Sequence, residues 1–336
     1  MIMTRILKID SESLKEAQKI ITSGGVVAFP TETVYGLGAN AFDTSAVNSI
    51  FEIKGRPNDN PLIVHVHRDY DISELVFDIP DYAVTLAKKF LPGPLTMVYK
   101  SRGKVSSAVS CGMDTLAIRI PSHEGAQKFL KYLDLPIAAP SANISKHVSP
   151  TSARHVYADL NGKIDLILDG GPCYGGIEST VLDCTSDIPV ILRSGLISQE
   201  MIKETVGECG EYVFKEGGIA RSPGMKYRHY SPRCKSVLYE YAEIEKAVAL
   251  YDAEREKKGT KVCILCDDKA AEFLGSRRFL SLGKTPEDMA ANLYSKLREC
   301  ENDTELLIAI APDMRGGIMV GVMNRLSKAC GNSNEN

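Results

Sequence analysis

Lys54 and Arg56 lie two residues apart in a loop rich in Pro and Asn, directly before an apolar run at 62–66. Both cations can pair with phosphate oxygens, and the prolines restrict the motion of the loop. The spacing therefore suits a polyphosphate site. Two solvated surface charges would produce the same pattern, and the residues alone do not separate the two interpretations.

Arg119 closes a segment in which apolar and other residues alternate strictly. Leu116 and Ile118 fall on one face of the predicted strand, and Thr115, Ala117 and Arg119 fall on the other. A guanidinium on such a face can bind a carboxylate through two parallel N–H groups. An arginine on a solvated face fits the pattern equally well.

Further polar residues sit at the ends of apolar runs, where open α/β sheets place their ligands. The segment 29–38 combines hydroxyls with glycines and could hold a small ligand or form a structural turn. Ser141–Asn143 end another predicted strand, and Ser149–Thr151 predict a helix start that favours anions, although capping alone explains Ser149. Residues 178–180 and Arg193 add hydroxyls and a cation.

Two common catalytic signatures are missing from the sequence. Gly283-Lys284-Thr285 ends like a phosphate-binding loop, but Arg278 occupies the position of the first glycine. A Gly-x-Ser-x-Gly elbow is also missing, so nothing supports an acyl-enzyme, and we predict no catalytic nucleophile. Gly36–Ala41 matches a dinucleotide fingerprint in letters and is interpreted as a turn.

Metal binding has little support in the residue spacing. Cys263 and Cys266 lie three apart in an apolar strand pattern, so they point to opposite faces and are predicted to be buried thiols. His65 and His67 share one face of a predicted strand, but no third ligand is close in sequence. One site-facing histidine with an incidental neighbour is therefore favoured over a metal pair.

Composition limits the class of protein. The chain has 336 residues, 44% of them hydrophobic and 25% charged, which indicates an ordinary globular protein of about two domains. Its net charge of −3 gives no overall attraction to nucleic acid or anionic membrane. Nine scattered cysteines and no signal-like start predict reduced thiols and a cytoplasmic location, and no apolar run is long enough to span a membrane.

Short apolar runs alternate with helical patterns, which predicts an α/β fold with two sheets. Predicted strands at 26–29, 62–66, 116–120, 165–168 and 190–192 belong to a domain spanning 1–207. Residues 208–235 are basic and contain Gly and Pro, so they are interpreted as a linker and as a lid over the site. A smaller parallel-sheet domain is predicted at 236–330, before a polar tail at 331–336.

Taken together and in this order, the polar segments resemble the YrdC-like threonylcarbamoyl-adenylate synthase family. The resemblance rests on Pro30–Gly38, Lys54-x-Arg56, Pro92–Thr96, Ser141-x-Asn143 and Glu178–Thr180. Residues 222–232 look like the segment that joins the two domains in the family's longer form. The resemblance implies a twisted mixed sheet with flanking helices in the first domain and a Rossmann-like parallel sheet in the second.

Family membership implies an enzyme that converts L-threonine, bicarbonate or CO2, and ATP to threonylcarbamoyl-AMP and pyrophosphate. The product feeds the modification of the adenosine next to the anticodon of tRNA, through a downstream tRNA threonylcarbamoyl transferase complex. By resemblance, the threonine site contains Thr31, His65, Arg119 and Ser179, with Arg119 on the carboxylate. The ATP site contains Lys54, Arg56, Asn58, Thr115, Ser141, Asn143, Ser149 and Arg193, with Tyr230 closing over the nucleotide.

ATP chemistry also implies Mg²⁺, for which the sequence identifies no ligand; Glu32 and Glu178 are weak candidates. Two other functions remain open on the residues. One is a factor that binds double-stranded RNA or tRNA, or acts in ribosome maturation, and would use the cations on a concave surface. A weak tRNA contact is compatible with the synthase as well as with such a factor. A carbamoyltransferase that uses carbamoyl phosphate would need a similar pocket.

Overall fold

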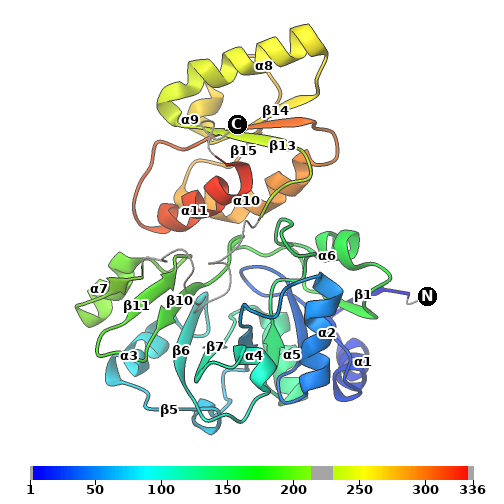
Figure 1. The fold of residues 1–336 in the computed structure, drawn as a ribbon, viewed down its shortest axis with the longest axis vertical. Helices are drawn as coiled ribbons and strands as arrows, with labels where there is room; N and C mark the ends of the chain where they lie inside the picture. The colour runs from blue at the N-terminus through cyan, green and yellow to red at the C-terminus, as the bar shows by residue number, and fades with distance from the viewer. Residues whose placement is uncertain (1–2, 213–229, 332–336) are drawn as a thin grey trace. The chain divides into compact units, whose positions relative to one another are not determined.

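The structure is a computed structural model that describes residues 3–212 and 230–331, with the side chains of 257 and 258 left aside. The chain divides into two compact units (Figure 1). The first comprises Met1–Ser145 and Pro150–Tyr227, and the second comprises Lys146–Ser149 and Arg228–Asn336. Most of the predicted linker and tail, at 213–229 and 332–336, lies outside the described residues, so the lid remains a prediction.

A mixed sheet of 12 strands forms the centre of the first unit, as the family resemblance implied. Its order is β1-β9-β2-β3-β8-β4-β7-β6-β10-β11-β12, and β5 pairs with β6. The strands are β1 (Arg5–Lys8), β2 (Val27–Phe29), β3 (Gly36–Asn40), β4 (Ile63–His65), β5 (Val76–Phe77), β6 (Leu95–Ser101), β7 (Thr115–Arg119), β8 (Ile137–Ala139), β9 (Leu166–Asp169), β10 (Thr180–Asp183), β11 (Val190–Arg193) and β12 (Gly210–Glu211).

Helices cover this sheet through two apolar clusters. The larger cluster joins one face of the sheet to α2, α3, α4, α6 and α7, and the second joins α1 and α5 to the other face around β2, β8 and β9. The helices are α1 (Ser11–Thr22), α2 (Thr44–Lys54), α3 (Asp81–Phe90), α4 (Ser107–Ser110), α5 (Glu124–Leu133), α6 (Ala153–Leu160) and α7 (Gln199–Val206), with a 3-10 turn at Ile72–Glu74.

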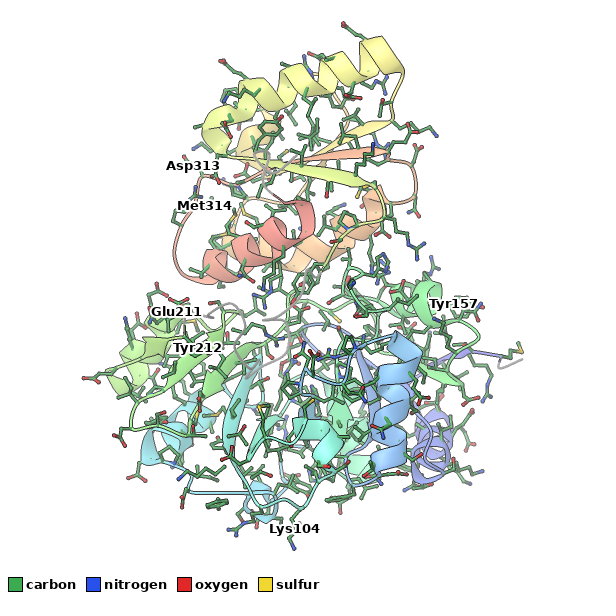
Figure 2. The ribbon with its side chains drawn as sticks, viewed as in Figure 1. Lys104, Tyr157, Glu211, Tyr212, Asp313 and Met314 are labelled. Atoms are coloured by element: carbon green, nitrogen blue, oxygen red, sulfur yellow. The ribbon has the colours of Figure 1, made fainter. Side chains whose placement is uncertain are left out.

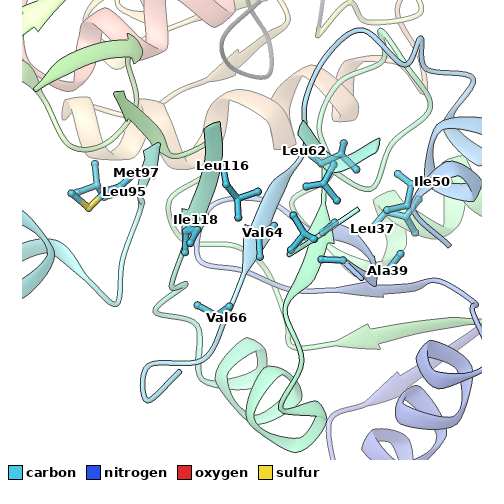
Figure 3. Packing of buried hydrophobic residues seen from close by; sticks show 14 of the residues in the cluster. Leu37, Ala39, Ile50, Leu62, Val64, Val66, Leu95, Met97, Leu116 and Ile118 are labelled. Atoms are coloured by element: carbon cyan, nitrogen blue, oxygen red, sulfur yellow. The ribbon is translucent and has the colours of Figure 1, made fainter. Parts of the chain in front are cut away.

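Alternation along β7 separates the core from the site. Leu116 and Ile118 are buried in the larger cluster, where Val64 of β4 and Met97 of β6 accompany them (Figure 3). The opposite face of β7 carries Thr115, Ala117 and Arg119, as the alternation predicted.

Around β6, β7, β10 and β11, the apolar cluster on that opposite face is small. It consists of Val98, Val181 and Leu192, with Ala117 and Tyr212 packed against it. Tyr212 follows β12 (Figure 2). Its backbone N–H donates to the Ile191 carbonyl at 2.9 Å. Polar side chains can therefore occupy the rest of this part of the face.

The second unit is built on a four-stranded parallel sheet, which confirms the predicted fold class. The strand order is β13-β16-β14-β15. Cys263 and Cys266 are both buried in β14. The elements are β13 (Lys235–Tyr239), a 3-10 turn at Tyr241–Glu243, α8 (Ile244–Lys258), β14 (Val262–Cys266), α9 (Asp268–Ala271), β15 (Phe279–Ser281), α10 (Pro286–Cys300), β16 (Leu306–Ile310) and α11 (Ile318–Cys330). No helix in the described residues is long and apolar enough to cross a membrane.

Two local predictions were wrong. Gly36–Asn40 is not a turn but strand β3, antiparallel to β2. A Cβ on Gly38 would lie 2.7 Å from Ile137 Cγ2 and 2.9 Å from Phe29 Cε1, so close packing explains this strand glycine. The helix predicted to start at Ser149 begins at Ala153, and Ser152 caps it by accepting a hydrogen bond from the His155 backbone N–H.

Candidate functional site

The strand order brings several predicted site residues together at the ends of neighbouring strands within the sheet. His65 pairs in register with Arg119 across β4 and β7, and Arg119 pairs with Thr96 across β7 and β6. Ser179 directly precedes β10, the next strand, and Arg193 ends β11 beyond it. Three residues expected at the threonine site therefore lie on neighbouring strands, beside Arg193.

Arg119 and Glu32 form a buried ion pair at the centre of this group. Arg119 Nη2 lies 2.8 Å from Glu32 Oε1, and the two residues are 3% and 1% exposed. The sequence analysis treated Glu32 as a weak Mg²⁺ candidate. A guanidinium at this distance repels a bare divalent cation, which brings no anion of its own to pair with Arg119, so the environment of Glu32 does not suit a metal ligand.

Hydroxyl groups and Arg193 fix the strand ends next to this pair. Ser179 Oγ lies 2.7 Å from Thr96 Oγ1, and Arg193 donates to Ser179 through Nε (to the carbonyl, 3.1 Å) and Nη2 (to Oγ, 3.2 Å). Gly195 makes the arrangement possible, because a Cβ there would lie 2.4 Å from the Thr180 nitrogen. A cation predicted for the ATP site thus directly contacts a serine predicted for the threonine site.

Thr31 is tied into its own loop. Its hydroxyl donates to the Val34 carbonyl at 2.6 Å and accepts from the backbone N–H groups of Thr33 and Val34 at 3.2 Å. The Glu32 carbonyl accepts from the Gly175 backbone N–H at 2.7 Å, which fixes the loop from a second side. Thr31 therefore shapes the segment that carries Glu32.

His65 is fully enclosed beside Arg119. Its ring packs edge-on against Phe29, with centroids 5.7 Å apart, and Nδ1 lies 3.1 Å from the Ile63 carbonyl. Burial, reinforced by the positive charge of Arg119, lowers the pKa of His65 to about 3. The imidazole is therefore neutral at pH 7 and can exchange hydrogen bonds with a ligand without adding charge.

This lowered pKa predicts a pH dependence of stability. The unfolded state takes up a proton near pH 6.5 while folded His65 stays neutral, so stability falls as the pH drops from about 6.5 toward 3. When the pH is lowered from 6 to 4.5, the unfolding free energy of the wild type should fall by about 2 kcal/mol more than that of His65→Asn. Urea unfolding at both pH values measures this difference, and equal losses in the two proteins would contradict the lowered pKa.

Lys54 organises the second group of predicted residues. It is the last residue of α2, is 2% exposed, and donates through Nζ to the carbonyls of Ser141 and Asn143. Nζ also lies 3.5 Å from Asn143 Oδ1. Lys54 therefore holds the loop after β8 that carries both predicted ATP residues.

The remaining predicted ATP residues of the first unit differ in burial. Arg56 is partly buried and donates through Nη2 to the Asn60 carbonyl at 2.9 Å, whereas Asn58 is exposed in the same loop. Thr115 is partly exposed at the start of β7, on the same face as Arg119. The residues predicted to bind threonine, around Arg119, and the residues predicted to bind ATP, near Thr115, thus lie toward opposite ends of β7.

Two predicted residues belong to the second unit. The Ser149 carbonyl accepts from Arg298 Nε at 3.5 Å, and the Tyr230 ring stacks on Tyr294 with centroids 5.2 Å apart. Tyr230 has a positive φ of 67°. Their assignment to the ATP site stays a prediction.

Sequence reasoning missed three residues of this region. Glu32 was not matched to Arg119, Thr96 was noted only as part of a motif, and Cys173 was not singled out. Cys173 is buried near Thr31, Glu32 and Arg119, and burial raises the pKa of its thiol to about 12. A signal for Thr96 existed, since it follows Pro-Gly-Pro at a strand start; nothing in the sequence indicated Cys173.

Comparisons with known proteins cover nearly the whole chain. A model of the Sua5, YciO and YrdC proteins, described as "Telomere recombination", matches residues 19–195, and one described as "Threonylcarbamoyl-AMP synthase, C-terminal domain" matches residues 197–331. The threonylcarbamoyl-AMP synthase of Pyrococcus abyssi is 41% identical over 329 residues, covering 96% of each chain. This chain belongs to the threonylcarbamoyl-AMP synthase family. The synthase of Bacillus subtilis is also 41% identical, over 98% of this chain and 96% of its own length.

Solved structures of the family share the fold. P. abyssi Sua5, solved in complex with L-threonine, superposes with a TM-score of 0.88 and 41% identity over 98% of both chains. Escherichia coli YciO matches 58% of this chain and 97% of its own length, with a TM-score of 0.52 and 25% identity. The family resemblance drawn from the motifs is therefore confirmed.

Proposed function

We propose that this chain makes threonylcarbamoyl-AMP and pyrophosphate from L-threonine, bicarbonate or CO2, and ATP. The observation that carries the proposal is the buried Arg119, which stands beside a neutral imidazole and a cluster of hydroxyls. Such a site suits a small amino acid whose carboxylate pairs with the guanidinium. The L-threonine complex of P. abyssi Sua5 supports this choice of ligand.

The reaction requires positioning more than a protein nucleophile. The threonine amine adds to CO2 to give a carbamate, and a carbamate oxygen then attacks the α-phosphorus of ATP while pyrophosphate leaves. Holding two substrates in line and neutralising phosphate charge can supply most of the rate enhancement. Hydroxyls and cations are the residue types that this chemistry needs.

The proposed layout follows β7. Arg119, His65, Ser179 and Thr31 hold threonine at one end of the strand, and Thr115, Lys54, Arg56, Asn58, Ser141 and Asn143 serve ATP toward the other. Arg193 contacts Ser179, which supports assigning it to the junction between threonine's carbamate and the phosphates. The proposal also retains Ser149 and Tyr230 for the nucleotide.

Mg²⁺ is proposed to enter with ATP. In the described part of the chain, no three His, Cys, Asp or Glu side chains are grouped to hold a metal. Mg²⁺ commonly binds substrate phosphates and keeps several waters, which fits a site without a protein cage. It would neutralise phosphate charge while this chain's cations orient the nucleotide.

The product is proposed to serve a downstream tRNA threonylcarbamoyl transferase complex, which modifies the adenosine next to the anticodon. Product analysis tests the chemistry. With ¹³C-bicarbonate, the full-length protein should release an adenylate that carries threonine and one ¹³C atom, as detected by mass spectrometry. If the product instead carries ¹³C only when ¹³C-labelled carbamoyl phosphate replaces bicarbonate, the result would favour a carbamoyltransferase.

A further inference from the structure

Glu32 is a buried acid whose hydrogen-bonding capacity is not used. The residue is 1% exposed, and neither carboxylate oxygen has a hydrogen-bond partner among the described residues. Leaving buried charged oxygens without donors is costly, and such groups are uncommon outside functional sites. The backbone of Glu32 is nevertheless fixed, because its carbonyl accepts from Gly175.

The neighbouring guanidinium balances the charge of Glu32 without forming an aligned hydrogen bond. Arg119 Nη2 lies 2.8 Å from Oε1, yet Nη2 and Nε of Arg119 also have no hydrogen-bond partner in the described structure. The N–H groups therefore do not point at the carboxylate. Both partners gain Coulomb attraction while their hydrogen-bonding directions stay available to a ligand.

The Glu32 carboxylate and the Arg119 guanidinium match the two charges of an amino acid. An α-amino acid carries its carboxylate and its ammonium on the same carbon, so it needs an anionic and a cationic partner in close proximity. Within the described residues, Glu32 is the carboxylate that pairs with Arg119. Two other ionisable neighbours of Arg119 do not carry a negative charge, because His65 is uncharged and the buried Cys173 keeps its proton.

We propose that Glu32 binds the α-ammonium group of the amino acid whose carboxylate binds Arg119, and thereby restricts the substrate to free primary α-amino acids. This assignment rests on the proposed function, which places the amino acid at Arg119. Hydroxy acids of the same shape lack the cation, so they can donate one hydroxyl hydrogen bond to Glu32 but make no ion pair with it. The carboxylate also holds the nitrogen in one position beside the Arg119-bound carboxylate.

Calorimetry with two ligands tests the assignment on the full-length protein. The ligands are L-threonine and (2S,3R)-2,3-dihydroxybutanoate, in which a hydroxyl replaces the ammonium. Glu32→Gln should weaken L-threonine binding by about tenfold or more, as expected for a lost charged hydrogen bond. The same variant should not weaken dihydroxybutanoate binding, because that ligand makes no ion pair with Glu32 and its carboxylate still binds Arg119.

Matched variants identify each alternative. Glu124→Gln removes an exposed acid of α5, paired with Lys128, and should change neither affinity. Equal weakening of both ligands by Glu32→Gln would overturn the assignment, because Glu32 would then act only by orienting Arg119. If Glu32→Gln does not fold, the wild-type protein provides the test: it should bind L-threonine at least about tenfold more tightly than dihydroxybutanoate, and equal affinities would overturn the assignment. Wild-type protein that binds neither ligand would overturn the proposed threonine site itself.

Discussion

Replacing Arg119 by Met is expected to lower kcat/KM for threonine by at least about 30-fold, since losing a buried charge partner costs about 2–5 kcal/mol. The Michaelis constant for ATP should change far less, because Arg119 faces the proposed carboxylate and not the nucleotide. Steady-state pyrophosphate release, with each substrate varied in turn, measures both values. Equal effects on threonine and ATP would remove the carboxylate role.

A double variant separates this functional loss from a stability loss. Arg119→Met alone leaves Glu32 as a buried charge without its partner, which destabilises a protein by about 3–5 kcal/mol. Arg119→Met with Glu32→Gln removes both charges and should recover most of the unfolding free energy, as measured by urea denaturation. Activity with threonine should stay low in the double variant. Activity that returns along with stability would show that the ion pair is only structural.

Replacing Lys54 by Met is expected to give the second large effect. The variant leaves the carbonyls of Ser141 and Asn143 buried without their donor, and a buried polar group left unsatisfied costs about 1–3 kcal/mol. We expect the unfolding free energy to fall by about 3 kcal/mol. The Michaelis constant for ATP should rise by a larger factor than that for threonine. Urea denaturation and steady-state kinetics measure the two effects.

An exposed lysine provides the matched comparison for Lys54. Lys131 pairs with Asp69 at the surface, and its side chain is 69% exposed. Lys131→Met should therefore leave stability within about 1 kcal/mol of the wild type, as expected for a surface pair. Similar losses in both variants would show that the Lys54 contacts contribute no more than an ordinary surface lysine.

The sequence predicted the part of the site that depends on local periodicity. Alternation in 115–120 placed Arg119 opposite the core-facing Leu116 and Ile118, and the structure shows this division. The runs at 62–66, which contains His65, and 190–192, which precedes Arg193, were predicted because buried strands are continuous apolar segments. These features need only neighbouring residues, so one sequence is sufficient to find them.

Contacts between distant segments could not be predicted in the same way. Glu32 and Arg119 are far apart in sequence, and their pairing follows from how the loop after β2 packs. Strand β3 was missed because its two glycines indicate a turn, whereas in the structure Gly38 leaves space for Phe29 and Ile137. Ser149 was misjudged as the helix start because Ser152, three residues later, offers the same capping chemistry.

Pyrophosphate release by the purified full-length protein is the most direct test of the proposed reaction. ATP and Mg²⁺ are supplied, and threonine and bicarbonate are omitted in turn, with CO2 removed from the buffers. The account predicts release only when both threonine and bicarbonate are present, and its loss in Arg119→Met. Release that does not need threonine, or salt-sensitive RNA binding without any release, would contradict the account and favour an RNA-binding factor.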